Sequence, residues 1–310
     1  MSERSSACFA EVLMLTRRKF LITGTLATAN TLALPYALRA QALKRLRNLP
    51  TLLAQLEHSN NCRLGVAVFD TGTGEKTGHR PDERFAMCST FKMLLAAAVL
   101  QRVDAGHEHL TRTIAVPAKP LVSHSPVTEQ HAGAEMTVST LCDAILTQSD
   151  NTAANLLLTA IGGPSGITSF ARSIGDKVTR LDRTETSLNE ALPGDPRDTT
   201  SPTAMIGNLQ ALLLGSVLSE SSRKQLINWM VANEYGNSRL RASLPTGWRA
   251  ADKTGANGDT TTNDIAIFWP PHQSPVLVSA YLTECPGTDA KRDTILAEVG
   301  HLVISAMQSA

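Results

Sequence analysis

A serine followed three positions later by a lysine opens a long apolar segment of this 310-residue sequence. The pair is Ser89 and Lys92, and residues 90–103 contain no Gly or Pro. If that segment is a helix, the spacing places the hydroxyl and the ammonium on one face, one turn apart. A serine hydroxyl is a weak nucleophile at its own pKa, and a neighbouring amine that takes its proton activates it. Ser89 is therefore a candidate nucleophile, and the alternative is a helix N-cap.

Two further stretches contain residue types that suit the same chemistry. Ser149-Asp150-Asn151 lies between two predicted helices, and Lys253-Thr254-Gly255 precedes a polar run. Taken by itself, Ser149-Asp150-Asn151 also fits a turn that caps a helix, and we expect Asp150 to have that structural role. The order Ser-x-x-Lys, Ser-Asp-Asn, Lys-Thr-Gly is the signature of class A β-lactamases and penicillin-binding proteins.

From about Leu43 to its last residue, the sequence resembles class A serine β-lactamases, most closely the exported enzymes of xanthomonad-type bacteria. The likeness extends beyond the three motifs to Phe85–Lys92, Ser125–His131, Ser149–Asn155 and Gly194–Thr200. It implies that Ser89 attacks the amide of penicillin-type and cephalosporin-type rings and forms an acyl-enzyme. Backbone N–H groups of Ser89 and Ala256 would form the oxyanion hole, and Lys92 and Ser149 would relay a proton to the departing ring nitrogen.

The resemblance also implies a set of substrate-binding residues. Lys253 and Thr254 would bind the substrate carboxylate, and Asn151 would bind the acylamino side chain. Many family members place an arginine on the strand where this sequence has Thr262, so we expect Arg239 to supply that charge, with a solvated helix-end arginine as the alternative. His124 matches a position at the mouth of the cleft where rings stack on substrates, and it could equally be a surface residue.

Glu185 decides between a turnover enzyme and a target that stays acylated. A carboxylate that faces the cleft can activate water against the acyl-enzyme ester, and Asn189 would help to hold that water. The alternative is a solvated loop charge, the usual state of a Glu between polar neighbours. Whether Lys92, or Glu185 acting through water, is the base for acylation stays open.

Arg183 and Asp198 bracket the loop that carries Glu185, and the family resemblance implies that they close it with an ion pair. Thr186 and Ser187 follow the glutamate where proline and glutamate are frequent in the family. A cis bond after Glu185 would therefore precede a residue other than proline.

The apolar patterns predict an α/β, two-lobed fold like that of serine β-lactamases and penicillin-binding proteins. Strands are expected over Arg63–Asp70, Asp264–Trp269 and Pro275–Leu282, with terminal helices over Leu49–His58 and Ala290–Gln308. Strands at both ends favour an antiparallel sheet flanked by the terminal helices, with an all-α lobe inserted between its parts and a cleft between the lobes. We expect residues 43–310 to form the catalytic domain, with 43–87 and 231–310 in the α/β lobe and 88–230 in the helical lobe. The middle helices are expected over Thr90–Val103, Val138–Thr147, Asn151–Ile161, Pro202–Gly215 and Ser219–Asn233.

Residues 1–42 have the composition of an export signal. Arg17 and Arg18 precede Phe20 and a weakly apolar stretch without acidic residues, which is typical of twin-arginine signals. We expect cleavage near Ala40 or Ala42, a periplasmic protein and no stable membrane anchor, since the apolar stretch is short and is interrupted by Asn30 and Pro35.

The charge balance of 29 basic and 28 acidic residues gives a net charge of +1 and excludes a whole-molecule attraction to nucleic acid. The expected partners are small β-lactams, and the default state is a monomer. We expect neither a cofactor nor a metal, since the His107-Glu108-His109 stretch fits a solvated turn.

Removal of the signal leaves Cys62, Cys88, Cys142 and Cys285, interpreted as mostly buried thiols whose pairing stays open. The rival functions are a D,D-peptidase and a β-lactam-binding sensor that remains acylated.

Overall fold

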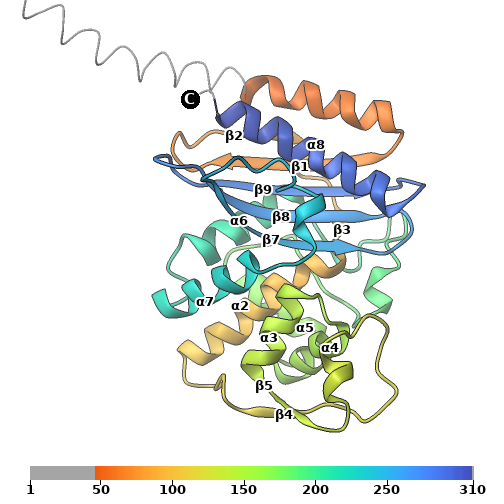
Figure 1. Ribbon diagram of the computed structural model, residues 1–310, viewed down its shortest axis with the longest axis vertical. Coiled ribbons are helices and arrows are strands. Elements are labelled where there is room, and N and C mark those ends of the chain that lie inside the picture. The colour runs from red at the N-terminus through yellow and green to blue at the C-terminus, as the bar shows by residue number, and fades with distance from the viewer. Residues whose placement is uncertain (1–45, 309–310) are drawn as a thin grey trace, which may run out of the picture.

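The computed structural model describes residues 46–308. Its centre is a five-stranded antiparallel sheet in the order β2-β1-β9-β8-β7, in the upper half of Figure 1. The strands are β1 (Arg63–Asp70), β2 (Lys76–His79), β7 (Arg249–Ala256), β8 (Thr262–Trp269) and β9 (Val276–Thr283). The N-terminal strands β2 and β1 join the C-terminal strands β9, β8 and β7 in one sheet through the pairing of β1 with β9, as the strands expected at both ends of the chain predict.

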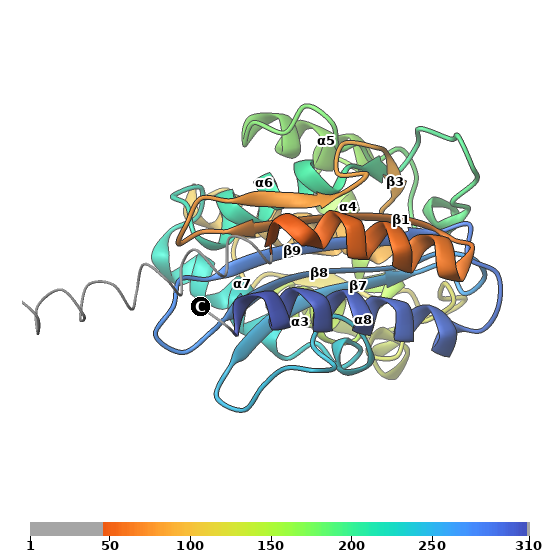
Figure 2. The same cartoon turned by 90° about the horizontal axis from the view of Figure 1, so that it is seen from above.

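Two terminal helices cover one face of the sheet and lie side by side in Figure 2. They are a helix over residues 46–60 and α8 (Asp289–Met307). Leu46, Leu49 and Leu53 are fully or almost fully buried at helical spacing, so the first helix presents one apolar stripe to the sheet. Within residues 46–308, no helix is both long and apolar enough to cross a membrane.

The second face of the sheet packs against a layer of helices built around α2 (Phe91–Asp104). Every residue from Phe91 to Leu100 is buried, and a helix that is apolar on all sides belongs in a core. The surrounding helices are α3 (Val138–Thr147), α4 (Asn151–Ala160), α5 (Pro164–Ser173), α6 (Pro202–Leu213) and α7 (Glu220–Val231). Short strand pairs join β3 (Phe85–Ala86) to β6 (Thr199–Thr200) and β4 (Thr113–Ala115) to β5 (Glu135–Thr137). Short 3-10 turns are η1 (Cys88–Thr90), η2 (Thr128–His131), η3 (Ser187–Asn189) and η4 (Gly236–Ser238).

Helix α5 and strand β7 are missing from the sequence-based expectation. Gly162-Gly163-Pro164 directly follows the predicted helix Asn151–Ile161 and has the composition of a helix end, but Pro164 is the first residue of α5, and Gly163, at φ +79°, precedes it. Proline suits the first helical position because its missing N–H would have no partner there. The apolar pattern does not predict β7, because Asp252 and Lys253 interrupt it.

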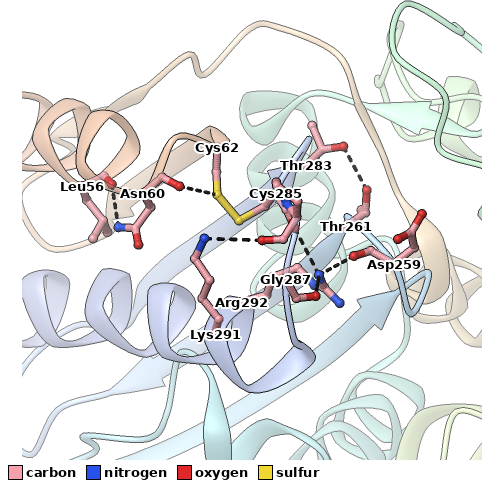
Figure 3. Close-up of a disulfide and its surroundings, with 11 residues drawn as sticks. Leu56, Asn60, Cys62, Asp259, Thr261, Thr283, Cys285, Gly287, Lys291 and Arg292 are labelled. Carbon is pink, nitrogen blue, oxygen red and sulfur yellow. Dashed lines mark hydrogen bonds between the residues drawn. A yellow bond between two sulfur atoms is a disulfide. The ribbon is translucent and has the colours of Figure 1, made fainter.

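The interpretation of the cysteines as mostly buried thiols applies to Cys88 and Cys142, which are free and buried. Cys62 and Cys285, whose pairing the sequence leaves open, form a disulfide across 223 residues of sequence (Figure 3). Cys62 directly precedes β1 and Cys285 follows β9. The antiparallel pairing of Arg63 with Thr283 brings the two sulfur atoms together.

Candidate active site

Ser89 lies in η1, the 3-10 turn that leads into α2, and Lys92 lies in the first turn of α2. Both side chains converge on one carboxylate. Ser89 Oγ donates to Glu185 Oε1 at 3.4 Å, and Lys92 Nζ lies 3.0 Å from the same oxygen. The spacing of three thus places the hydroxyl and the ammonium on one face, as predicted, and Glu185 from a distant loop joins them.

Lys92 is the centre of this hydrogen-bonded group. Its ammonium donates to the carbonyl of Ser149 at 2.7 Å, to Ser149 Oγ at 3.4 Å and to Asn151 Oδ1 at 2.6 Å. Complete burial lowers the pKa of Lys92, and the charge and hydrogen bond of Glu185 oppose that shift. A lysine in this state can exchange protons with neighbouring hydroxyl groups more readily than an exposed one.

Ser149 lies between two lysines at the turn from α3 to α4. Lys253 Nζ donates to Ser149 Oγ at 3.2 Å, and the backbone of Ser149 has a left-handed φ of +57°. Burial, reinforced by the charge of Lys92, lowers the pKa of Lys253 to about 7. The hydroxyl of Ser149 is therefore in contact with both lysines, so it can pass a proton between them and a bound molecule.

Asp150 holds this turn in place. It accepts from the N–H of Ala153 at 2.8 Å, which caps α4, and from the N–H and hydroxyl of Thr128. The structural role expected for Asp150 is confirmed.

Glu185 is 4% exposed, so the alternative of a solvated loop charge is wrong. Asn189 Nδ2 donates to Glu185 Oε2 at 2.7 Å, as the pairing of these residues predicts. Asn155 of α4 holds the backbone of Glu185 from both sides, with its Oδ1 accepting from the N–H and its Nδ2 donating to the carbonyl, each at 2.9 Å. The peptide between Glu185 and Thr186 is cis. The sequence reasoning did not assign Asn155 a role, although it lies four residues after Asn151 and so on the same face of α4.

The loop that carries Glu185 is closed by the expected ion pair. Arg183 Nε lies 2.6 Å from Asp198 Oδ2, and Asp198 is fully buried. Asp198 Oδ1 also accepts from the backbone N–H groups of Asp182 and Arg183. These bonds fix both ends of the loop to each other and keep Glu185 in place over η1.

The end of β7 lies directly against η1, because residue 255 is a glycine. A Cβ atom there would lie 2.9 Å from the carbonyl oxygen of Met87 and 3.0 Å from the nitrogen of Ser89. Asn263 of β8 strengthens the contact by donating to the carbonyl of Met87 at 3.0 Å. The close approach brings Ala256, the last residue of β7, beside the chain segment that carries Ser89.

The remaining predicted site residues border this group. Arg239 donates to the carbonyls of Gly255 and Asn263 at 3.1 and 3.0 Å, so its guanidinium lies over β7 and β8. Its Nε pairs with Asp293 at 2.7 Å, which excludes a freely solvated helix-end charge. Thr254 is a buried residue of β7.

Asn151 makes two side-chain hydrogen bonds within the protein: its Nδ2 donates to the carbonyl of Ser123 at 2.8 Å, and its Oδ1 accepts from Lys92. His124 is exposed and joins the site through its backbone carbonyl, which accepts from the N–H of Asn151. Its ring lies 5.8 Å from that of Tyr235, a residue that the sequence reasoning did not single out.

Comparisons with known proteins agree with this geometry. The model of the β-lactamase enzyme family matches residues 47–307. The chain is 47% identical to β-lactamase L2 of Stenotrophomonas maltophilia, covering 93% of this chain and 98% of that protein. It is 45% identical to β-lactamase CTX-M-8 of Citrobacter amalonaticus, and the match covers 81% of this chain and 86% of that protein. A solved class A β-lactamase described as the last common ancestor of Gram-negative bacteria superposes with a TM-score of 0.82 at 59% identity, covering 84% of this chain and 99% of its own. The chain therefore belongs to the class A serine β-lactamases.

Proposed function

We propose that this β-lactamase opens the ring amide of penicillins and cephalosporins through an acyl-enzyme on Ser89, and that water activated by Glu185 releases the product. One observation carries the proposal. Glu185 is a buried carboxylate that contacts the hydroxyl of Ser89 and is held by Asn189. A buried carboxylate in that position lies within reach of an ester formed on Ser89.

Acylation begins when Ser89 Oγ attacks the lactam carbonyl carbon and its proton passes to a base. Two bases are candidates for that proton, Lys92 and Glu185 acting through a water molecule, and the choice between them stays open. Backbone N–H groups of Ser89 and Ala256 stabilise the negative charge that develops on the carbonyl oxygen. The carbon–nitrogen bond then breaks, and Ser149 protonates the ring nitrogen while the lysines at its hydroxyl replace that proton.

Substrate binding follows from the charges that border the site. Lys253 and Thr254 bind the carboxylate next to the ring nitrogen, and Arg239 adds a third donor group from the far side of β7. Asn151 holds the acylamino side chain through its Nδ2, exchanging the contact that this group now makes with Ser123. His124 lies at the rim, where its ring can contact the substrate.

Deacylation requires a water molecule placed against the ester carbonyl. Asn189 Oδ1 is a buried acceptor with no hydrogen-bond partner among the described residues, and the Oε2 atom of Glu185 lies next to the same side chain. A water bound between these groups would donate one proton to Glu185 and attack the ester with its oxygen. The ester bond breaks, the proton returns to Ser89 Oγ, and the ring-opened acid leaves.

The rival functions differ from this one in the fate of the acyl-enzyme. We would follow hydrolysis of a chromogenic cephalosporin by absorbance and the adduct on Ser89 by intact mass, for the wild type and for Glu185→Ala. We expect turnover by the wild type and an accumulating adduct in the variant. Glu190→Ala is the matched control, because Glu190 is a half-exposed carboxylate on the same loop that pairs with Arg183, and it should keep turnover. A wild type that is acylated once and then silent would identify a D,D-peptidase or a sensor.

We propose further that the protein acts in the periplasm after export by the twin-arginine route. The residues that motivate this proposal, 1–42, lie outside the described part of the chain, and its support is chemical. A disulfide between Cys62 and Cys285 persists in an oxidising compartment. Replacing Arg17 and Arg18 together by lysine should leave the precursor in the cytoplasm, as measured by cell fractionation. Continued export of that variant would exclude the twin-arginine route.

A further inference from the structure

The disulfide between Cys62 and Cys285 adjoins the turn that follows the proposed oxyanion strand. Cys285 lies two residues beyond β9, and its N–H donates to the carbonyl of Thr260 at 3.1 Å. Thr260 belongs to the turn over residues 257–261, which connects β7 to β8. The covalent bond thus anchors a segment that itself contacts this turn, as Figure 3 shows.

A second contact joins the same two segments. The hydroxyls of Thr261 and Thr283 lie 2.9 Å apart, and both residues are buried. Thr283 is the last residue of β9 and pairs with Arg63, the first residue of β1. The hydrogen bond between Thr261 and Thr283 therefore lies at the end of the β1–β9 pair, next to the disulfide. The turn is therefore held at two neighbouring positions by the segment that the disulfide anchors.

Arg292 of α8 completes the connection. Its side chain is 1% exposed, and its Nη1 donates to the carbonyls of Asp259, Cys285 and Gly287 while its Nη2 pairs with Asp289. The burial of a guanidinium is costly, and the two terminal nitrogens of Arg292 offset that cost through these oxygens, whereas its Nε has no hydrogen-bond partner among the described residues. The carbonyls of the turn and of the disulfide segment must therefore keep their positions around it.

The turn transmits this constraint toward Ser89 because it is internally rigid. Asn257 Oδ1 accepts from the N–H groups of Asp259, Thr260 and Thr261 at 2.9 to 3.0 Å. A shift of residues 259–261 would therefore move Asn257, which directly follows Ala256. In the proposed function, the N–H of Ala256 binds the lactam carbonyl oxygen in the oxyanion hole. The turn directly follows Ala256, so it borders the substrate next to that carbonyl, on the side of the acylamino group.

We propose that the disulfide Cys62–Cys285 and Arg292 are positioning elements for the β7–β8 turn, and that they restrict the size of the substrate side chain the site accepts. The inference rests on the proposed acyl-enzyme function of Ser89. Loss of the disulfide or of Arg292 lets the turn move outward, which makes room for bulky acylamino side chains. Small substrates are then held less precisely against Ser89. Sub-ångström changes of this kind alter relative rates without removing activity.

The test compares kcat and KM for benzylpenicillin and for a cephalosporin with a bulky, branched acylamino side chain. The variants are the double replacement Cys62→Ser with Cys285→Ser, and Thr283→Val, which removes the hydroxyl bond to Thr261 and keeps the disulfide. We expect the ratio of kcat/KM, bulky over small, to rise by about threefold or more in the double variant. Thr283→Val should move the ratio in the same direction by a smaller factor.

Cys142→Ala is the matched control, because Cys142 is a buried thiol of α3 far from the turn in sequence and structure. It should change thermal stability without changing the ratio. A kcat/KM ratio that is unchanged or lower in the double variant would overturn the inference and leave the disulfide a purely stabilising role. If the double variant does not fold, the ratio in Thr283→Val decides in the same way. Failure of the wild type to turn over both substrates would count against the proposed function instead.

Discussion

Lys92 Nζ lies 3.0 Å from Glu185 Oε1, and neither side chain is exposed to solvent. The two charges come from different parts of the chain, the first turn of α2 and the loop closed by Arg183 and Asp198. Removing one partner of a buried ion pair strongly destabilises the folded protein, because the other charge is left without compensation. The carboxylate of Glu185 therefore favours the charged form of Lys92, and this contact is the basis of the first prediction.

Replacing Lys92 by alanine should slow both formation and hydrolysis of the acyl-enzyme, each by a factor of about 10² to 10⁴. The reason is that Lys92 contacts Ser149 and Glu185 at once, so its loss affects the proton path to the ring nitrogen and the carboxylate that activates water. Stopped-flow mixing with intact-mass detection separates the two steps. If Lys92→Ala acylates at the wild-type rate and only accumulates adduct, the lysine has no part in acylation.

Asn155→Ala should lower kcat by about tenfold or more and raise the fraction of enzyme that is acylated at steady state. The substitution removes both hydrogen bonds that fix the backbone of Glu185, so the carboxylate loses its alignment while the nucleophile is untouched. Thr159→Ala is a suitable control, since this exposed residue of the same helix donates its hydroxyl to the backbone carbonyl of Asn155 and does not contact Glu185 through it. An unchanged kcat in Asn155→Ala would show that the loop holds Glu185 without help from α4.

The pKa of Lys253, lowered by burial to about 7, predicts a loss of substrate affinity with rising pH. Below this value the free enzyme carries the ammonium that attracts the substrate carboxylate, and above it the charge is lost. We expect kcat/KM for carboxylate-bearing β-lactams to fall as pH rises through about 7. Lys253→Arg should abolish that limb of the profile because a guanidinium stays charged. An identical pH profile in the arginine variant would assign the ionisation to another group.

The same shift contributes to stability with a definite sign. Because the pKa of Lys253 is lower in the folded protein than in the unfolded chain, the unfolded state binds more protons between about pH 7 and the usual lysine value of 10.5. This residue therefore makes the free energy of unfolding rise with pH across that interval.

Gly255→Ala should lower kcat by about a hundredfold, comparable to the loss of one oxyanion donor. The added Cβ would press on the carbonyl of Met87 and the nitrogen of Ser89, both backbone atoms that cannot move away without displacing η1. Gly207→Ala is the control: a Cβ at residue 207 would meet no atom within 4 Å. Steady-state kinetics of the two folded variants would decide, and equal activities would mean that β7 yields at no catalytic cost.

The sequence predicts the elements of the fold best where the apolar pattern is regular. The predicted bounds of β1 and α3 agree with the structure, since the apolar run in one and the helical spacing in the other are uninterrupted. Prediction fails at β7, where the polar residues of the site replace apolar ones in a central strand. It also fails at α5, whose first residue is a proline that equally suits the end of the preceding helix.

Local sequence by itself determined the identity of the reactive groups and the motif order that marks the family. It also determined that the side chains of Ser89 and Lys92 lie on the same side of the chain, one helical turn apart. Tertiary structure alone decided that Glu185 is buried against Ser89, that Asn155 clamps its backbone, and that Cys62 pairs with Cys285. The physical reason is range. The spacing of two residues on one helix is a property of the backbone, whereas contacts between residues far apart in sequence depend on how the loop, the helices and the sheet pack together.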